Sequence, residues 1–192
     1  MDLLTGIGLA LPAGLNAYIP LLGVAMAQRA GWIHLPAPYS VLGEWWAVGL
    51  IVILLCVEIL ADKVPAVDHV NDAINTLVRP ASGALLMLAT TGQLSARFPI
   101  VMIVAGIVLA GGVHAAKAAA RPVINVGTAG VGAPIASFVE DVVAVLVTWL
   151  AFVAPVLAIA GVVALLAIAA RAVMRRRARA RALPDQAPAP PP

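Results

Sequence analysis

FVEDVVAVLVTWLAFVAPVLAIAGVVALLAIAA, residues 138–170, is apolar apart from two acidic residues near its start, and it indicates the architecture of the chain more clearly than any other segment. One straight helix of about 30 residues would measure about 45 Å, whereas the hydrocarbon core of a bilayer is about 30 Å thick. Pro155 interrupts the stretch and removes a helical hydrogen bond. The stretch therefore predicts either one kinked transmembrane helix or two helices joined in a tight hairpin near Pro155.

The rest of the chain shares this apolar character. Of its 192 residues, 62% are hydrophobic and only 11% are charged, and the mean hydropathy is +1.03. A soluble domain carries about 25% charged residues, which it needs to cover its surface with groups that water can solvate. The composition therefore predicts an integral membrane protein surrounded by the lipid bilayer, and it excludes a soluble enzyme or a secreted domain.

Further apolar segments precede the quoted stretch, and each is long enough or nearly long enough to enter a bilayer. They are residues 3–27, 45–61, 81–94 and 99–116. The first of them contains Pro12, Asn16 and Pro20, so we expect it to form a kinked or discontinuous helix whose freed carbonyls are satisfied by protein neighbours.

Two polar connectors separate these segments. Residues 62–79 carry apolar side chains at spacings of three and four opposite Asp and Asn, which is typical of an amphipathic helix at the membrane surface, and Pro80 should end it. Residues 117–134 are rich in glycine and contain two prolines, so we expect a loop that re-enters the membrane where protein surrounds it.

The distribution of positive charge indicates the number of crossings. With a hairpin at Pro155, all of the 12 Lys and Arg residues except Arg29 and Arg97 lie on the side of the Arg-rich tail. A single kinked helix would move Lys63, Arg79, Lys117 and Arg121 to the opposite side. Because cytoplasmic loops are enriched in Lys and Arg, the sequence predicts an all-α polytopic membrane helix bundle of about six short transmembrane segments, with both termini cytoplasmic in the cell (inner) membrane.

The chain divides into two parts. Residues 1–172 form the predicted transmembrane helical domain, and residues 173–192 form a basic and then Pro/Ala-rich cytoplasmic tail, whose last part, residues 183–192, should be disordered. The basic part has no interleaved aromatic residues, so we expect attraction to anionic lipid and no nucleic-acid binding.

A weak internal repeat is also predicted. Glu58, Pro65 and Pro80 follow one another at spacings that resemble those of His114, Pro122 and Pro134. Two such units would enter the membrane from the same side, and transporters are often built from duplicated units with the site between them.

Three runs carry a resemblance to a known family: GLNAYIP at residues 14–20, EILADKVPAVDH at 58–69 and RPASG at 79–83. Together they resemble a bacterial multi-pass membrane family catalogued as domain of unknown function 4126, over residues 6–170. The resemblance implies a membrane location and supplies no activity, so the function has to be inferred from the polar residues.

Polar residues within or beside the apolar segments are the candidates for function, because an ionisable group inside a membrane usually marks an ion path, a proton relay or an ion pair. Glu58 and Asn16 lie deepest in apolar runs, and Asp62 shares a helix face with Glu58. The similar numbers of acids and bases favour ion pairs for most of the rest, for example Arg79 with Asp72 and Arg121 with Glu140 or Asp141. The candidates are Asn16, Glu58, Asp62, Lys63, Asp68, His69, Asp72, Arg79, His114, Lys117, Arg121, Glu140 and Asp141.

We expect these residues to serve a small transporter or channel for an ion or small solute, with Glu58 and Asp62 as the proton- or cation-binding carboxylates. Two alternatives stay open: a protein that handles a lipid or polyprenyl phosphate through its cationic residues, and a non-catalytic scaffold or partner subunit. No motif of an enzyme, a metal site or a cofactor site is apparent in the sequence. The small size of the bundle is compatible with a homo-oligomer.

Overall fold

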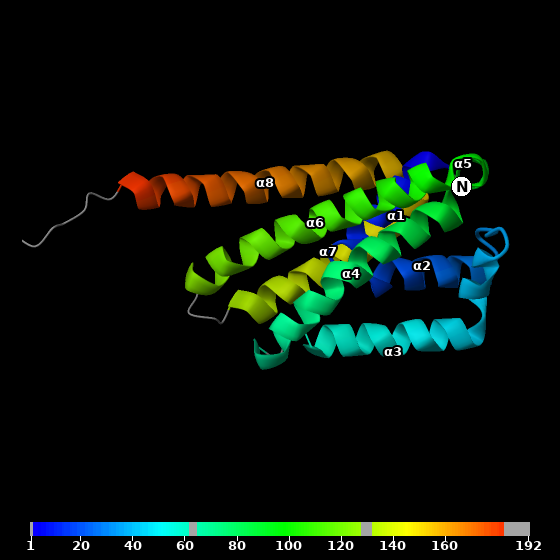
Figure 1. The fold of residues 1–192 in the computed structure, drawn as a ribbon, viewed down its shortest axis with the longest axis horizontal. Helices are drawn as coiled ribbons and strands as arrows, with labels where there is room; N and C mark the ends of the chain where they lie inside the picture. The colour runs from blue at the N-terminus through cyan, green and yellow to red at the C-terminus, as the bar shows by residue number, and fades with distance from the viewer. Residues whose placement is uncertain (1, 62–64, 128–131, 183–192) are drawn as a thin grey trace, which may run out of the picture.

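The computed structural model describes residues 2–61, 65–127 and 132–182, without the side chains of residues 65–72, 122–127, 133, 169, 173 and 176–182. Over these residues the chain is all-α, as predicted, and it contains eight α-helices and one short 3₁₀ helix (Figure 1). They are α1 (Leu3–Ala13), α2 (Tyr18–Arg29), η1 (Tyr39–Gly43), α3 (Trp45–Ala61), α4 (Pro65–Thr90), α5 (Gln93–Arg97), α6 (Pro99–Gly127), α7 (Gly132–Val153) and α8 (Pro155–Ala182).

The stretch 138–170 forms a hairpin. Helix α7 ends at Val153, and Pro155 begins α8 at the first helical position, where its missing N–H leaves no bond unmade. The amide of Ala154 still donates to Leu150 O (2.6 Å), while the carbonyl of Ala154 accepts from the amide of Ala158 (3.2 Å). Helices α7 and α8 then pack against each other in opposite directions (Figure 1). The hairpin alternative therefore holds, and the single kinked helix is excluded.

The first apolar segment is discontinuous, as predicted, and the break also reverses the chain. As the chain passes through α1, the break and α2, it contacts α7 three times. The first contact lies near the C-terminal end of α7, the second nearer its beginning, and the third near its C-terminal end again. The contacts are Gly8 with Ala151, Asn16 with Asp141, and Gly23 with Thr148. The N-terminus and the end of α2 therefore lie at the same end of the bundle, whereas α8 ends at the other (Figure 1). The expectation that this segment crosses the bundle once is not met.

Five long helices surround this folded-back pair. Helices α3, α4, α6, α7 and α8 run alternately from one end of the bundle to the other, and α1 packs against α4, α6, α7 and α8 (Figure 1). Helices α4 and α6 cross very closely at Gly83 and Gly106, where a Cβ on Gly83 would lie 2.5 Å from the carbonyl oxygen of Gly106. Small residues let helix backbones approach in this way, as is common between membrane helices.

Two connectors differ from their predictions. Pro80 lies inside α4 and does not end a surface helix, so the polar stretch and the next apolar segment form one helix of 26 residues. The ring of Pro80 fits against α6 at Gly111, where there is room for it. Helix α6 continues to Gly127, so most of the predicted re-entrant loop is helical; residues 128–131 of that prediction lie outside the described residues.

The exterior of the bundle is apolar and its interior holds polar groups. Large apolar side chains such as Ile53 and Ile100 are 62% and 74% exposed, while Arg79, Asn16 and Glu58 are 0%, 1% and 2% exposed. Three helices, Pro99–Arg121, Pro134–Val153 and Pro155–Ala172, are long and apolar enough to span a bilayer, and Leu3–Ala13 and Trp45–Ala61 are shorter apolar helices. This distribution suits lipid as the surrounding solvent and identifies a membrane protein.

Candidate functional site

An ion pair between α3 and α4 lies at the core of the site. Arg79 is fully buried, and its Nη2 and Nε donate to Oε1 of Glu58 at 3.0 and 3.3 Å. A buried charge without a partner is strongly unfavourable, so each of these two groups depends on the other. The partner of Glu58 is therefore 21 residues away on the next helix, a spacing at which the sequence alone suggested no pair.

His114 on α6 extends this pair. Its Nδ1 lies 3.0 Å from Arg79 Nη1, and its Nε2 lies 3.3 Å from the hydroxyl of Thr76. A guanidinium can only donate, so Nδ1 must be the acceptor and the proton of the neutral ring sits on Nε2. Nε2–H then donates to Thr76. The network thus joins three helices and fixes His114 in one tautomer.

The break between α1 and α2 is held by side chains from three other helices. The amide of Asn16 donates to Asp141 on α7 (3.0 Å), and its carbonyl oxygen accepts from the backbone amides of Tyr18 and Ile19 (3.1 and 3.2 Å). Asn16 therefore caps the start of α2, as a short polar side chain does at a helix N-terminus. Backbone carbonyls at the break accept from Ser82 Oγ at Ala17 (2.8 Å) and from Lys117 Nζ at Leu15 (3.2 Å).

Lys117 makes a second ion pair, with the partly buried Glu140. Its Nζ lies 2.7 Å from Glu140 Oε2, and the lysine side chain is only 3% exposed. Lys117 follows His114 by three residues on α6, so the two side chains lie on one face of the helix. The two ion pairs are thus neighbours around the break. We call Asn16, Glu58, Arg79, His114, Lys117, Glu140 and Asp141 together the polar centre.

Some features of the polar centre were not predicted. The structure pairs Glu140 with Lys117 and Asp141 with Asn16, whereas Arg121 was the predicted partner. Thr76 and Ser82 were missed, although they precede and follow Arg79 by three residues. That spacing is a polar stripe along one face of α4, and it could have been detected by continuing the helix through Pro80.

The remaining candidates are outside this cluster or outside the description. Arg121 is partly buried further along α6 and has its own interaction there. Asp68, His69 and Asp72 belong to α4, but their side chains are not described, and Asp62 and Lys63 lie outside the described residues. In the part of the chain that can be searched, three or more His, Cys, Asp or Glu side chains nowhere gather as a metal site would require.

An apolar groove adjoins the polar centre. It has a volume of about 280 Å³ and lies between α6, α7 and α8, with Leu15, Val143 and Leu166 among its lining residues. Lys117 and Glu140 are the charged residues of its wall. The polar centre therefore has an apolar space beside its second ion pair.

The two predicted repeat units each contain one of the two ion pairs. Glu58 and Arg79 join α3 to α4, and Lys117 and Glu140 join α6 to α7, with acid and base exchanged between the units. Both helix pairs begin at the same end of the bundle (Figure 1). A common origin of the two units stays a prediction.

Comparison with known proteins gives a family and no activity. Neither a curated protein nor a solved structure matches the chain. The model of one family, described as "Domain of unknown function (DUF4126)", matches residues 3–175, which include every member of the polar centre. The chain therefore belongs to this family of unknown function, as its sequence resemblance indicated.

Proposed function

We propose that this membrane protein is a small transporter or channel, and not an enzyme, that moves an ion or small solute past the polar centre. The observation that supports the proposal is the placement of two ion pairs, one buried and one partly buried, around a helix break in the middle of an apolar bundle. Ionisable groups are unfavourable inside a membrane and are found there chiefly where a function requires them. Broken helices are the usual way in which membrane transporters present backbone groups to a substrate.

The ends of α1 and α2 add partial charges to this region. The carbonyl end of α1 and the amide end of α2 both face the break, where Asn16, Lys117 and Ser82 contact backbone groups. Helix ends carry about half an elementary charge of opposite sign, so cationic and anionic groups can both be stabilised there. A passing ion would have to compete with these internal partners.

Glu58 and Asp62 are the proposed cation- or proton-binding carboxylates, and Arg79 and Arg121 are the balancing cations. A proton on Glu58 would cancel its attraction to Arg79, so binding at this carboxylate would open the pair. The change would reach His114 directly, because Arg79 contacts both side chains. In this proposal the network is the element that responds to the ion.

For the membrane topology, we propose five crossing helices and one re-entrant pair, α1 and α2. The Arg-rich C-terminus would be cytoplasmic in the inner membrane, and the N-terminus would lie on the opposite side. This arrangement keeps all Lys and Arg residues except Arg29 and Arg97 in the cytoplasmic half or the tail, as in the six-segment prediction. Anionic lipid would then contact the basic part of α8.

Flux into liposomes tests the proposal. Protein would be reconstituted with a pH-sensitive dye or a Na⁺- or K⁺-sensitive dye inside, and parent flux should exceed that of protein-free liposomes for at least one ion. The double variant Glu58→Gln/Arg79→Gln removes both charges of this ion pair, and it should lose that flux. Exposed Glu44→Gln is the matched control. Equal flux in the parent and the double variant would remove Glu58 and Arg79 from the pathway.

Lipid handling is a second candidate, favoured by the apolar groove beside Lys117 and Glu140. A phosphate-bearing lipid could place its chain in the groove and its headgroup near cationic side chains. In that case Arg79→Gln or Arg121→Gln should reduce activity more than Glu58→Gln. A lipid-scrambling assay in the same liposomes would separate the two candidates.

A further inference from the structure

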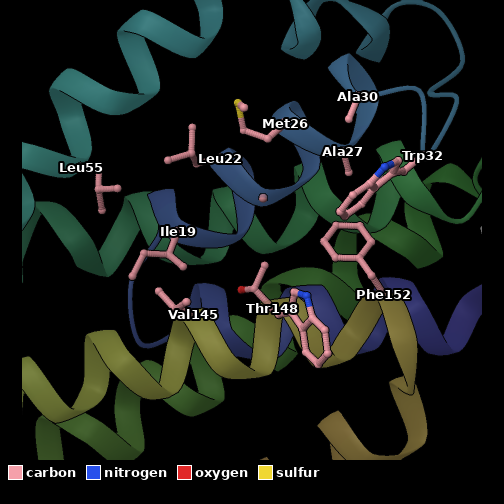
Figure 2. A pocket seen from close by; sticks show the side chains of 12 residues that line it. Ile19, Leu22, Met26, Ala27, Ala30, Trp32, Leu55, Val145, Thr148 and Phe152 are labelled. Atoms are coloured by element: carbon pink, nitrogen blue, oxygen red, sulfur yellow. The ribbon is translucent and has the colours of Figure 1, made fainter.

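A second cavity lies away from the polar centre, between α2, α3 and α7. It has a volume of about 510 Å³ and is almost entirely apolar (Figure 2). Figure 2 shows Leu22 and Met26 on α2, Leu55 on α3 and Val145 on α7 around it, with Trp32 and Phe152 close together at one end. None of the residues of the polar centre lines this cavity.

Thr148 supplies the one side-chain hydroxyl in the cavity wall. The side chain is 5% exposed, and its Oγ1 has no hydrogen-bond partner among the described residues. Other buried threonines of the bundle behave differently, since the hydroxyls of Thr90 and Thr91 donate to the carbonyls of Leu86 and Met87, each at 2.7 Å. A buried hydroxyl without a partner is unfavourable and uncommon, so an acceptor that a ligand brings to Thr148 would remove this cost.

The position of the cavity indicates the kind of ligand. Thr148 precedes the end of α7 by five residues, or about 7.5 Å, at the end of the bundle where Trp32, Trp45 and Trp46 are exposed. Exposed tryptophans mark the level of the lipid headgroups. The cavity continues inward to Leu55, ten residues or about 15 Å along α3 from Trp45. It therefore starts near the headgroup level and follows the direction of lipid chains.

We propose that this cavity binds an acyl chain of a bilayer glycerophospholipid, whose ester carbonyl accepts a hydrogen bond from the hydroxyl of Thr148. The occupant needs one acceptor near the headgroup level and an otherwise apolar, narrow body, and a lipid chain with its ester has this chemistry. A protein helix does not, because its carbonyls are already bonded within the helix. The lipid is also the solvent around the bundle, so the site needs no separate delivery.

Photolabelling in proteoliposomes tests the site. The protein is reconstituted in phosphatidylethanolamine and phosphatidylglycerol with a trace of an ester phospholipid that carries a diazirine in one acyl chain. After illumination, labelled peptides are mapped by mass spectrometry. We expect label on cavity residues such as Leu22, Leu55 and Val145, above that on the outer faces of α6 and α8. Label spread evenly over the exposed apolar faces would overturn the proposal.

Two comparisons isolate the hydrogen bond. Thr148→Val should reduce cavity labelling roughly fivefold, the effect of one neutral hydrogen bond, while Thr90→Val should leave it unchanged. The matching diazirine lipid with an ether in place of the ester should label the parent protein no better than it labels the Thr148→Val variant. Equal labelling by the ester and ether lipids in the parent would overturn the assignment even if a variant failed to fold. Leu22→Trp, which fills the cavity, should lower labelling by both lipids.

Discussion

The pair formed by Glu58 and Arg79 should be strongly coupled in stability. Glu58→Gln keeps the shape of the side chain and removes its charge, so the guanidinium of Arg79 stays buried with its bond to His114 but loses the carboxylate of Glu58. Loss of one partner of a buried ion pair costs about 3–5 kcal/mol. Arg79→Gln leaves the carboxylate of Glu58 buried in the same way and should cost about as much.

The double variant Glu58→Gln/Arg79→Gln should lose much less free energy of unfolding than the sum of the losses in the two single variants. Both charges are then absent, and two neutral amides can bond to each other across the same gap. We therefore expect a coupling free energy of about 2 kcal/mol or more between the two positions.

Unfolding in mixed micelles, with circular dichroism as the readout and SDS as the denaturant, measures these free energies. Exposed Arg97→Gln and Glu44→Gln are the matched controls, and each should change the free energy of unfolding by less than about 0.5 kcal/mol. Additive effects of the two buried substitutions would refute the pairing, because independent residues show no coupling.

Other predictions concern the helix break and the N-terminus. Gly14→Ala should lower the free energy of unfolding by about 1–3 kcal/mol, because a Cβ at this position would meet Ala110 O and Val113. Gly112→Ala is the control, because a Cβ at Gly112 would point into open space, and it should not lower the free energy of unfolding in the same assay. Asn16→Ala should lower the free energy of unfolding by about 1–2 kcal/mol, because it removes the cap of α2 and the hydrogen bond to Asp141. Hydrogen-exchange mass spectrometry should then show faster amide exchange at Tyr18 and Ile19, and unchanged exchange would contradict the capping role of Asn16. At the exposed N-terminus, hydrogen bonds from Thr5 hold the pKa of Asp2 below its ordinary 3.8. The carboxylate therefore stabilises α1 above that pH and loses this effect as the pH falls through its folded-state pKa, so the stability difference between the parent and Asp2→Asn should be constant from pH 7 to 5 and change only at lower pH.

Much of the architecture follows from apolar patterning. The length of residues 138–170, the position of Pro155 and the distribution of Lys and Arg together favoured the hairpin that α7 and α8 form. Pro12 and Asn16 likewise predicted the break in the first apolar segment. The reversal at that break could not be predicted, because a kinked helix and a folded-back pair have the same sequence signature. It depends on the close approach of Gly14 to α6 and on the contact of Asn16 with Asp141.

The polar residues were easier to identify than to connect. Their rarity in apolar runs identified Glu58 and Asn16, and His114 and Lys117 were candidates in or beside the next apolar segment. The pairing of Glu58 with Arg79, however, depends on how α3 and α4 pack. Pro80 obscured that packing, since a proline usually ends a helix, and here the space at Gly111 lets α4 continue. The membrane prediction rests on bulk composition, which tertiary packing does not alter.

The fold-back of α1 and α2 at the polar centre, inside a bilayer, can be tested most directly by the sidedness of three positions. In a Cys56→Ser background, Asp2→Cys, Ala30→Cys and Met174→Cys would each be labelled in sealed membrane vesicles with a membrane-impermeant maleimide; all three positions are exposed. We expect positions 2 and 30 to be labelled from the same side and position 174 from the other. Labelling of positions 2 and 174 from one side, with position 30 on the other, would show that the first segment crosses the membrane and that α1 and α2 do not fold back.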